Sequence, residues 1–368
     1  MAHHATMDDI ARALLQKGRG AGSNATGRFE REKREVFDDG WGTADEEPPQ
    51  LSTSFIRDST RTIIARNDSP DIPFDRSINP YRGCEHGCIY CFARPTHAYL
   101  GLSPGVDFES RILVKEQAPA LLAAELRKPS YRCRPIALGT NTDPYQPAER
   151  RYRIMRGILE VLREFRHPVT IVTKSALIQR DIDILADMAK DNLAACAVSV
   201  TTLDRKLARA MEPRAATPER RIETLAALTG AGIPTSVMAA PMIPALNDAE
   251  LEAILERAAL AGVLGAGYSM LRLPLEVAPL FVEWLNNHFL AKAKHVMSLV
   301  REGHGGKDYD PQWGQRMTGT GPYAELLRIR FETACRRLKL NLGRGRPWRL
   351  DITKFTPPPL PSAQFRLF

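Results

Sequence analysis

The chain has 368 residues, of which 43% are hydrophobic and 26% charged, and its formal net charge is +8. This length and composition allow one large α/β domain with extensions and a substantial core. No apolar run approaches the roughly 20 residues that are needed to span a bilayer, and the N-terminus lacks the apolar core of a signal peptide. We therefore expect a cytoplasmic protein without membrane segments.

The chain divides into four parts by composition. Residues 1–50 are rich in Gly, Ala and charged residues without sustained periodicity, so we expect this segment to be mostly disordered. Residues 51–278 are expected to form the main domain, and residues 279–345 a basic helical extension. Residues 346–368 are expected to form a proline-rich tail, because repeated prolines favour an extended spacer without a core of its own.

The main domain contains about six strand–helix units. The first strand is expected near Ser77–Tyr81, and later strands are the runs PIALG, VTIVT, AACAVSV, PTSVMAA and YSMLRL. Apolar spacing predicts a helix over Arg150–Phe165, and Thr217 followed by Pro218 is typical of a capped helix start. Such repeated units imply a parallel sheet, either doubly wound or coiled into a barrel, with the active site at the carboxyl ends of the strands.

Three cysteines lie within the eight residues CEHGCIYC, directly after the first expected strand. They are Cys84, Cys88 and Cys91. In a reducing compartment such a group indicates metal or redox chemistry. A structural zinc site needs four ligands, and His86 lies inside the loop, where its geometry for a fourth ligand is poor. The other cysteines are isolated: Cys133, Cys196 and Cys335. A [4Fe-4S] cluster held by three thiolates, with one iron open to a non-protein ligand, fits the count better.

The spacing C-x3-C-x-Tyr-C resembles the cluster loop of the radical S-adenosylmethionine (SAM) enzymes. The resemblance implies a partial (β/α)6 barrel of the TIM type with a helical C-terminal extension. It also implies that Cys84, Cys88 and Cys91 ligate a [4Fe-4S] cluster, and that SAM is cleaved reductively to methionine and a 5′-deoxyadenosyl radical. An electron donor such as flavodoxin or ferredoxin is then an expected partner.

The same resemblance implies SAM contacts at the carboxyl ends of the strands. Tyr90 matches the aromatic residue that packs against adenine. Thr140-Asn141-Thr142-Asp143 follows the second main strand, where relatives bind the SAM amino group. Ser199 and Thr201 end the fourth strand, where relatives contact the ribose and the carboxylate. Arg214 opens the next helix and is a candidate partner of the methionine carboxylate.

Within that superfamily, NPYRGCEHGCIYCFAR and GTNTDPYQPAER resemble the spore photoproduct lyase-like group, often described as DNA repair photolyase-like proteins. The resemblance covers about Ser54 to Leu340. Those lyases reverse a thymine dimer and bring a cysteine hydrogen donor near the loop after the second strand. That loop has no cysteine here, and Cys133 precedes the strand and is expected to point away. Tyr145 is an alternative donor, and the catalytic residues and the exact reaction stay unassigned.

Two features connect the chain to nucleic acid. Residues 291–349 carry 13 Lys/Arg and 5 Asp/Glu, which is the charge expected of a nucleic-acid-binding segment, and Tyr323 and Trp348 lie among these charges as candidates for base stacking. The segment Gln364-Phe365-Arg366-Leu367-Phe368 resembles the Q-x-x-L-F peptide by which bacterial repair and replication proteins bind the sliding clamp.

We therefore predict a radical SAM enzyme that acts on nucleic acid, in the repair or modification of DNA. Two alternatives stay open at this stage. One is a radical SAM enzyme whose substrate is RNA, a peptide or a small metabolite. The other is a noncatalytic iron–sulfur or zinc module that binds nucleic acid through the basic segment.

Overall fold

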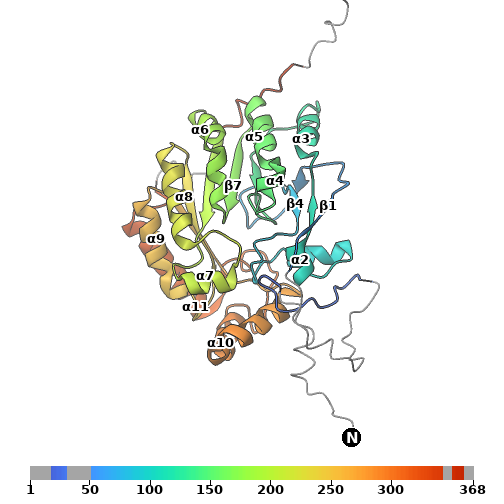
Figure 1. The fold of residues 1–368 in the computed structure, drawn as a ribbon. Coiled ribbons are helices and arrows are strands. Elements are labelled where there is room, and N and C mark those ends of the chain that lie inside the picture. The colour runs from blue at the N-terminus through green and yellow to red at the C-terminus, as the bar shows by residue number, and fades with distance from the viewer. Residues whose placement is uncertain (1–17, 31–50, 343–349, 360–368) are drawn as a thin grey trace, which may run out of the picture.

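The structure, a computed structural model, describes residues 18–30, 51–342 and 350–359. Within these ranges the centre of the molecule is a seven-stranded sheet in the order β10-β9-β8-β7-β6-β3-β2 (Figure 1). All strands are parallel except β2 (Ala65–Arg66), which pairs antiparallel with β3. The parallel strands are β3 (Arg76–Ile78), β6 (Ile136–Leu138), β7 (Val169–Thr173), β8 (Ala194–Ser199), β9 (Thr235–Met242) and β10 (Gly265–Met270).

The strand order decides between the two folds that the sequence allows. The six parallel strands follow one another across the sheet in chain order, so the winding never reverses. A doubly wound sheet requires such a reversal, whereas right-handed crossovers in one direction place every helix on the same face. The expected partial (β/α)6 barrel is therefore confirmed, and the carboxyl ends of its strands lie at one edge.

Helices cover the outer face of the sheet and enclose the main core between themselves and the strands (Figure 1). The helices between the strands are α3 (Ala118–Leu126), α4 (Glu149–Tyr152), α5 (Ile154–Glu164), α6 (Ile182–Lys190), α7 (Arg205–Met211), α8 (Pro218–Gly230) and α9 (Leu251–Leu260). Short 3-10 helices η3 (Ala176–Asp181) and η4 (Asp248–Glu250) precede α6 and α9. The Thr217 hydroxyl accepts a bond from the Arg220 N–H at 3.5 Å and caps α8, as the sequence predicts.

The helix expected over Arg150–Phe165 is divided into α4 and α5. Arg153 between them has a φ of 50°, in the left-handed region. The carboxylate of Glu149 accepts the N–H of Met155 at 3.0 Å and so caps the start of α5. The division therefore serves to place Glu149, which is fully buried, at the junction.

The expected first strand near Ser77–Tyr81 is also divided between two sheets. Its first part is β3, and its second part is β4 (Tyr81–Arg82), in a small sheet of order β1-β5-β4 with β1 (Ser54–Arg57) and β5 (Arg111–Val114). The cysteine loop follows β4 and leads into η2 (Arg94–Leu100) and α2 (Val106–Ser110). The loop therefore lies at the carboxyl-end edge, the lower end of the molecule in Figure 1.

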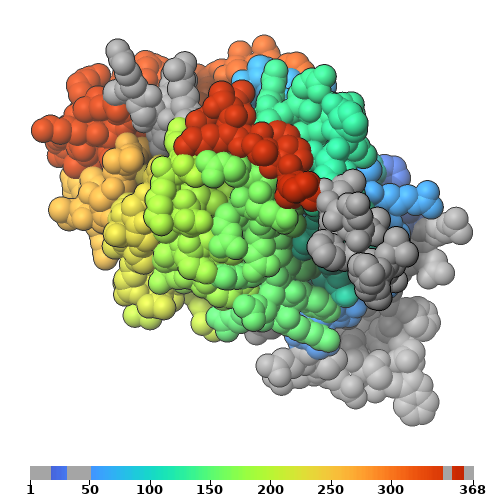
Figure 2. Space-filling model, turned by 90° about the horizontal axis from the view of Figure 1, so that it is seen from above, coloured from blue at the N-terminus to red at the C-terminus, as the bar shows by residue number. Residues whose placement is uncertain are grey.

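The C-terminal extension is helical, with α10 (Val277–Glu302) and α11 (Gly321–Arg337) on either side of a glycine-rich loop. Residues 350–359 cross the opposite end of the molecule, where the Asp351 and Thr356 N–H groups donate to the carbonyls of Asn192 and Phe165 (Figure 2). The stacking candidate Trp348 and the clamp-like peptide 364–368 lie outside the described residues. No helix in the described ranges has the length and apolarity to cross a membrane.

Residues 18–30 pack on the folded domain, so the disorder expected of residues 1–50 does not hold for them. Ala21 is 1% exposed, and Glu109 accepts hydrogen bonds from the backbone N–H groups of Arg19, Gly20 and Ala21 at 2.7, 3.0 and 2.8 Å. The remainder of that segment lies outside the described residues.

Candidate functional site

The cysteine loop is held by backbone bonds to distant elements. The N–H of Cys84 donates to the carbonyl of Phe108 at 2.9 Å, and the N–H of Ile89 donates to that of Met211 at 3.0 Å. Cys84 and Cys88 are 6% and 8% exposed, and Cys91 is half-buried. The three predicted cluster ligands therefore lie together at the carboxyl-end edge with limited access to solvent.

The surroundings of two of these thiols disfavour their ionisation. Burial raises the pKa of Cys84 well above its usual range, and the carboxylate of Asp143 and the thiols of Cys88 and Cys91 raise it further. Burial likewise raises the pKa of Cys88. A thiolate forms here only with nearby positive charge, which bound metal supplies. In the part of the chain that the structure describes, no three His, Cys, Asp or Glu side chains surround a single ion position.

The loop after β6 is tied to the cysteine loop through Asp143. Its carboxylate accepts bonds from the Thr173 hydroxyl at 2.6 Å and the Lys174 N–H at 2.7 Å, and it lies 3.4 Å from Nδ1 of His86. Burial opposes the charge, but His86 and the hydrogen-bond donors outweigh it and lower the pKa of Asp143 to about 2. His86 is thus engaged with Asp143, and both belong to the support of the cysteine loop.

Gln146 forms a second link that sequence reasoning missed. Its side-chain amide donates to the carbonyl of Gly83 at 3.1 Å and accepts the N–H of Glu85 at 2.9 Å. These two bonds bracket Cys84 and satisfy backbone groups that are buried. Side chains of the motif GTNTDPYQ therefore hold the motif RGCEHGC in place. In the sequence, only the three-residue spacing between Asp143 and Gln146 could have indicated that both side chains face the cysteine loop.

Tyr90 is positioned by a chain of buried polar groups. Its hydroxyl donates to the carboxylate of Glu212, which also pairs with the guanidinium of Arg221. Arg221 in turn donates to the carbonyl of Ser199 at 3.1 Å. Glu212 and Arg221 are each 2% exposed, so the pair is rigidly held. The ring of Tyr90 is thereby fixed in the same buried cluster as Cys88.

Arg214, the predicted partner of the methionine carboxylate, pairs with a carboxylate of the cysteine loop. Its Nη1 lies 2.8 Å from the carboxylate of Glu85, and its N–H donates to the carbonyl of His86 at 3.3 Å. Lys174 at the end of β7 places its ammonium 5.8 Å from the centroid of the Tyr90 ring. Among the described residues this ammonium has no carboxylate partner, which makes Lys174 a candidate that sequence reasoning missed.

The remaining predicted SAM contacts differ in how their polar groups are used. Asn79 receives the side chain of Thr140 and the N–H groups of Asn141 and Thr142 at 3.0 to 3.5 Å, and the Thr142 hydroxyl donates to the Tyr81 carbonyl. These groups organise the loop itself. In contrast, the Thr201 hydroxyl, on a residue that is 1% exposed, has no hydrogen-bond partner among the described residues.

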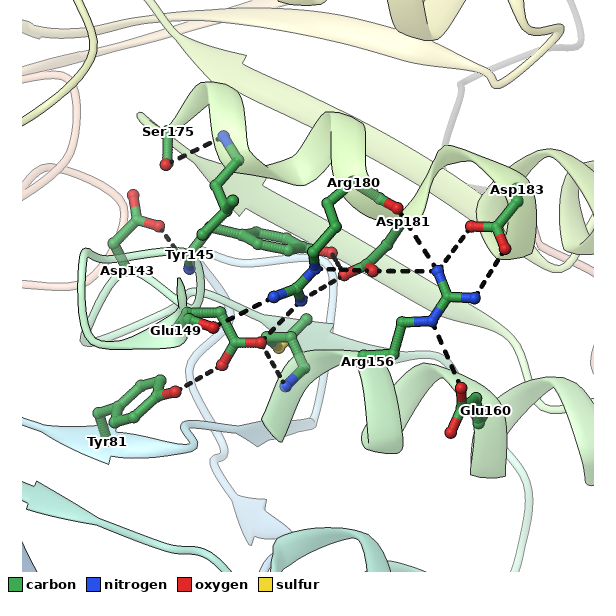
Figure 3. Close-up of polar contacts among 12 residues, drawn as sticks. Tyr81, Asp143, Tyr145, Glu149, Arg156, Glu160, Ser175, Arg180, Asp181 and Asp183 are labelled. Atoms are coloured by element: carbon green, nitrogen blue, oxygen red, sulfur yellow. Dashed lines mark hydrogen bonds and ion pairs between the residues drawn. The ribbon is translucent and has the colours of Figure 1, made fainter. Parts of the chain in front are cut away.

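Tyr145, the alternative hydrogen donor, belongs to a buried polar network (Figure 3). Its hydroxyl donates to Asp181 at 3.2 Å, and Asp181 pairs with Arg180 at 2.8 Å. Arg180 also contacts the carboxylate of Glu149, which accepts the Tyr81 hydroxyl at 2.5 Å. Tyr145 is fully buried with its hydroxyl occupied, so the structure places it in the support of the fold.

The three isolated cysteines lie away from the cluster loop. Cys133 precedes β6 at the opposite edge of the sheet, beside Arg132, whose carbonyl accepts a bond from Arg76 at the start of β3. Cys196 is inside β8, and Cys335 is buried on α11. The prediction that Cys133 points away from the site is therefore confirmed.

A buried ion pair fastens the cysteine loop to the segment 18–30. The guanidinium of Arg94 donates to the carbonyls of Cys88 and Gly87 at 3.0 and 3.2 Å and pairs with the carboxylate of Glu109. Glu109 simultaneously accepts the N–H groups of residues 19–21, as described above. The N-terminal segment therefore packs directly over the loop, and a Cβ on Gly20 would lie only 1.8 Å from the Gly87 carbonyl oxygen.

The basic segment 291–349 is less exposed in charge than its composition indicates. Arg330 and Arg337 on α11 pair with Glu252 and Glu256 on α9, and Arg316 pairs with Asp71. Tyr323 donates its hydroxyl to Asp248 and packs partly buried against the main core, so at least part of this side chain is used within the fold. The sequence predicts a basic surface over this segment. Only the Lys and Arg side chains that have no acidic partner in the fold can contribute to such a surface.

This chain belongs to the radical SAM superfamily, as the fold and the cysteine loop indicate. The family model of that superfamily matches residues 78–258, which contain all three cysteines of the loop. The sequence is 40% identical to an uncharacterized protein of Mycobacterium tuberculosis over 234 residues, 63% of this chain and 69% of that protein. It is 29% identical to an uncharacterized protein of Methanocaldococcus jannaschii over 173 residues, 47% of this chain and 62% of that protein.

Structures of spore photoproduct lyase share the fold. A variant with bound AdoMet and dinucleoside spore photoproduct has a TM-score of 0.56 at 14% identity and covers 77% of this chain and 78% of its own. A second variant has a TM-score of 0.51 at 15% identity and covers 77% and 79%. The protein is a radical SAM enzyme, and a [4Fe-4S] cluster and SAM are the cofactors of its family. Enzymes of this superfamily typically take electrons from a flavodoxin or ferredoxin.

Proposed function

We propose that Cys84, Cys88 and Cys91 hold the [4Fe-4S] cluster and that the enzyme cleaves SAM reductively to act on nucleic acid. The observation that supports the first part is the position of the three cysteines on one loop at the carboxyl-end edge, with Cys84 and Cys88 buried. When bound, the cluster supplies the electron that cleaves SAM. The protein's part is to orient SAM and to exclude water.

The residues around the loop fit the groups of SAM. The Tyr90 ring is a fixed apolar face for adenine, and the unpartnered hydroxyl of Thr201 offers a hydrogen bond to the ribose. Lys174 carries an ammonium without a carboxylate partner among the described residues, whereas Arg214 is paired with Glu85. We therefore assign the methionine carboxylate to Lys174 and a supporting role to Arg214.

The proposal for the substrate class rests on the fold. The structurally similar spore photoproduct lyase binds AdoMet together with a dinucleoside photoproduct. The loop after β6 lacks the cysteine that our comparison with the lyases requires, so we propose repair or modification of DNA without assigning the reaction. The hydrogen donor is not Tyr145 in this proposal, because its hydroxyl is buried and bonded to Asp181.

The test is anaerobic reconstitution of the full chain with iron and sulfide, followed by reduction with SAM. We expect about four irons per chain and release of 5′-deoxyadenosine. Replacing Cys84, Cys88 or Cys91 with Ala should abolish cluster binding, whereas Cys133→Ala, at the opposite edge, should retain it. Full iron loading of the three loop variants would contradict the ligand assignment, and absence of 5′-deoxyadenosine from loaded wild type would contradict the reaction.

A further inference from the structure

Arg272 occupies a fixed position beside the cysteine loop. It follows β10, the last parallel strand, at the carboxyl-end edge. Its neighbours Leu271 and Leu273 are each 1% exposed and belong to the same buried cluster as Cys88 and Tyr90. Because the residues on both sides are packed in the core, the backbone is anchored here. The side chain of Arg272 is therefore held at the carboxyl-end edge of the sheet, which we call the mouth of the barrel.

The guanidinium of Arg272 stacks on an aromatic ring of the cysteine loop. Its central carbon lies 4.2 Å from the centroid of Phe92, the residue that follows Cys91. Phe92 is 41% exposed, which is unusual for so large an apolar side chain next to a cofactor loop. A cation stacked in this way has its flat face occupied, and its N–H edge stays available for an anion.

No carboxylate in the described ranges forms an ion pair with this charge, although Tyr309, Cys91 and Asp71 lie near enough to stabilise it electrostatically. Arg272 is half-buried and has neither an ion pair nor a hydrogen bond there. The nearby acid Asp71 is engaged by Arg316 and by the N–H of Gly314 at 2.7 Å. Burial lowers the pKa of Arg272, but a guanidinium stays protonated at neutral pH.

Arg272 contrasts with five other arginines near the site and on the extension. Arg94, Arg214, Arg221, Arg330 and Arg337 each have a carboxylate partner. Partial burial of an unpaired charge is unfavourable, so retention of one at the mouth is explained if a ligand provides the anion. A planar fork of N–H donors matches a phosphate group in geometry and charge.

We propose that Arg272, stacked on Phe92, binds a phosphodiester group next to the nucleotide that enters the barrel. This inference rests on the proposed function, since it names the anion of a nucleic-acid substrate. Phe92 holds the guanidinium at the correct angle, and its exposed edge gives the sugar or base an apolar surface. The methionine carboxylate of SAM is the competing anion, and the experiment must distinguish the two.

The experiment measures binding of a fluorescent single-stranded DNA 12-mer to the reconstituted full chain without reductant, by anisotropy as a function of salt. Arg272→Gln should weaken binding about tenfold, which is the effect of one good charged contact, and should reduce the salt slope by about 0.7. Phe92→Leu should weaken binding about two- to fivefold. Arg220→Gln, on the exposed face of α8, is the matched control and should bind as wild type does.

A series of 12-mers that each carry one neutral methylphosphonate identifies the phosphate. At one position the neutral linkage should weaken binding to wild type but not to Arg272→Gln. Equal affinity and salt slope in wild type and Arg272→Gln would overturn the inference, as would a loss confined to SAM binding. If wild type itself binds no DNA while it still releases 5′-deoxyadenosine from SAM, the nucleic-acid substrate is wrong and the radical chemistry stands.

Discussion

Replacing Arg94 with Met should lower the free energy of unfolding of the metal-free protein by about 3–5 kcal/mol, because it leaves the Glu109 carboxylate buried without its cation. Both side chains are fully buried. The guanidinium also donates to the carbonyls of Gly87, Cys88, Pro104 and Gly105 at 3.0 to 3.2 Å. Four carbonyls that lose a donor add to the cost, so the upper part of this range is expected.

The assay is equilibrium urea denaturation of the apo protein in reducing buffer, followed by circular dichroism. Arg220→Met is the matched control, because Arg220 forms an exposed pair with Glu223 and its loss should leave the unfolding free energy nearly unchanged. A second readout is the alkylation rate of Cys88 under native conditions, which should rise when the loop loses its anchor. A decrease in unfolding free energy below about 1 kcal/mol, with an unchanged alkylation rate of Cys88, would refute the reasoning. Breaking a buried ion pair should lower the unfolding free energy by more than this.

Four further predictions concern the site, the acid stability and the tail. Gln146→Ala should remove the two hydrogen bonds on either side of Cys84, lower the free energy of unfolding by about 1–3 kcal/mol, and reduce the iron bound on reconstitution. Full iron loading of this variant would contradict the role of Gln146 in holding the cysteine loop. Thr201→Val removes an unpartnered buried hydroxyl, so the apo protein should be stabilised by about 1 kcal/mol while SAM affinity measured by calorimetry falls; unchanged affinity would exclude this hydroxyl as a SAM contact. Burial lowers the pKa of His167 from 6.5 to about 4, so the unfolded chain binds its proton first and stability is lost as pH falls from 6.5 toward 4. Over this pH range the free energy of unfolding should fall by about 3 kcal/mol because of His167. The fall should be smaller in His167→Gln, and urea midpoints at pH 7, 5.5 and 4.5 test this. The peptide 364–368 should retain purified sliding clamp in a pull-down; equal retention by a chain that ends at Ala363 would exclude it.

The cofactor loop was accessible from sequence because its chemistry is local. Cys84, Cys88 and Cys91, the proposed cluster ligands, belong to one short loop, and their place after a strand follows from apolar periodicity. Likewise, the cap of Thr217 on α8 depends on residues three positions apart. Patterns between residues a few positions apart can be recognised directly in the sequence.

The partners of the predicted SAM residues were not accessible in this way. Arg214 has the charge that a carboxylate needs, but the fold brings Glu85 to it from 129 positions away. Lys174 has the same charge without any distinguishing pattern, and only its position over Tyr90 makes it a candidate. Residue type therefore indicated that a cation is needed for a carboxylate. Long-range pairing decided that Arg214 is engaged by Glu85, whereas Lys174 has no carboxylate partner among the described residues.

The net charge of the extension shows the same limit. A count over residues 291–349 indicates a basic surface, yet α11 turns Arg330 and Arg337 toward acids on α9. Among the described residues, one cation without an ion pair lies at Arg272, outside that segment, where the sequence shows an ordinary strand end. Charge composition is a sum, whereas the electrostatic field depends on which charges are adjacent.

The sequence by itself determined the repeated strand–helix units, the parallel sheet that they imply, and the three-cysteine loop at its carboxyl-end edge. These follow from periodicity and spacing over a few residues. Only the tertiary structure decided that the sheet winds in one direction, that residues 18–30 pack over the cysteine loop through Glu109, and that Arg272 is held on Phe92 without a counter-ion. Each depends on contacts between segments far apart in the chain, which the folded backbone brings together and local pattern does not encode.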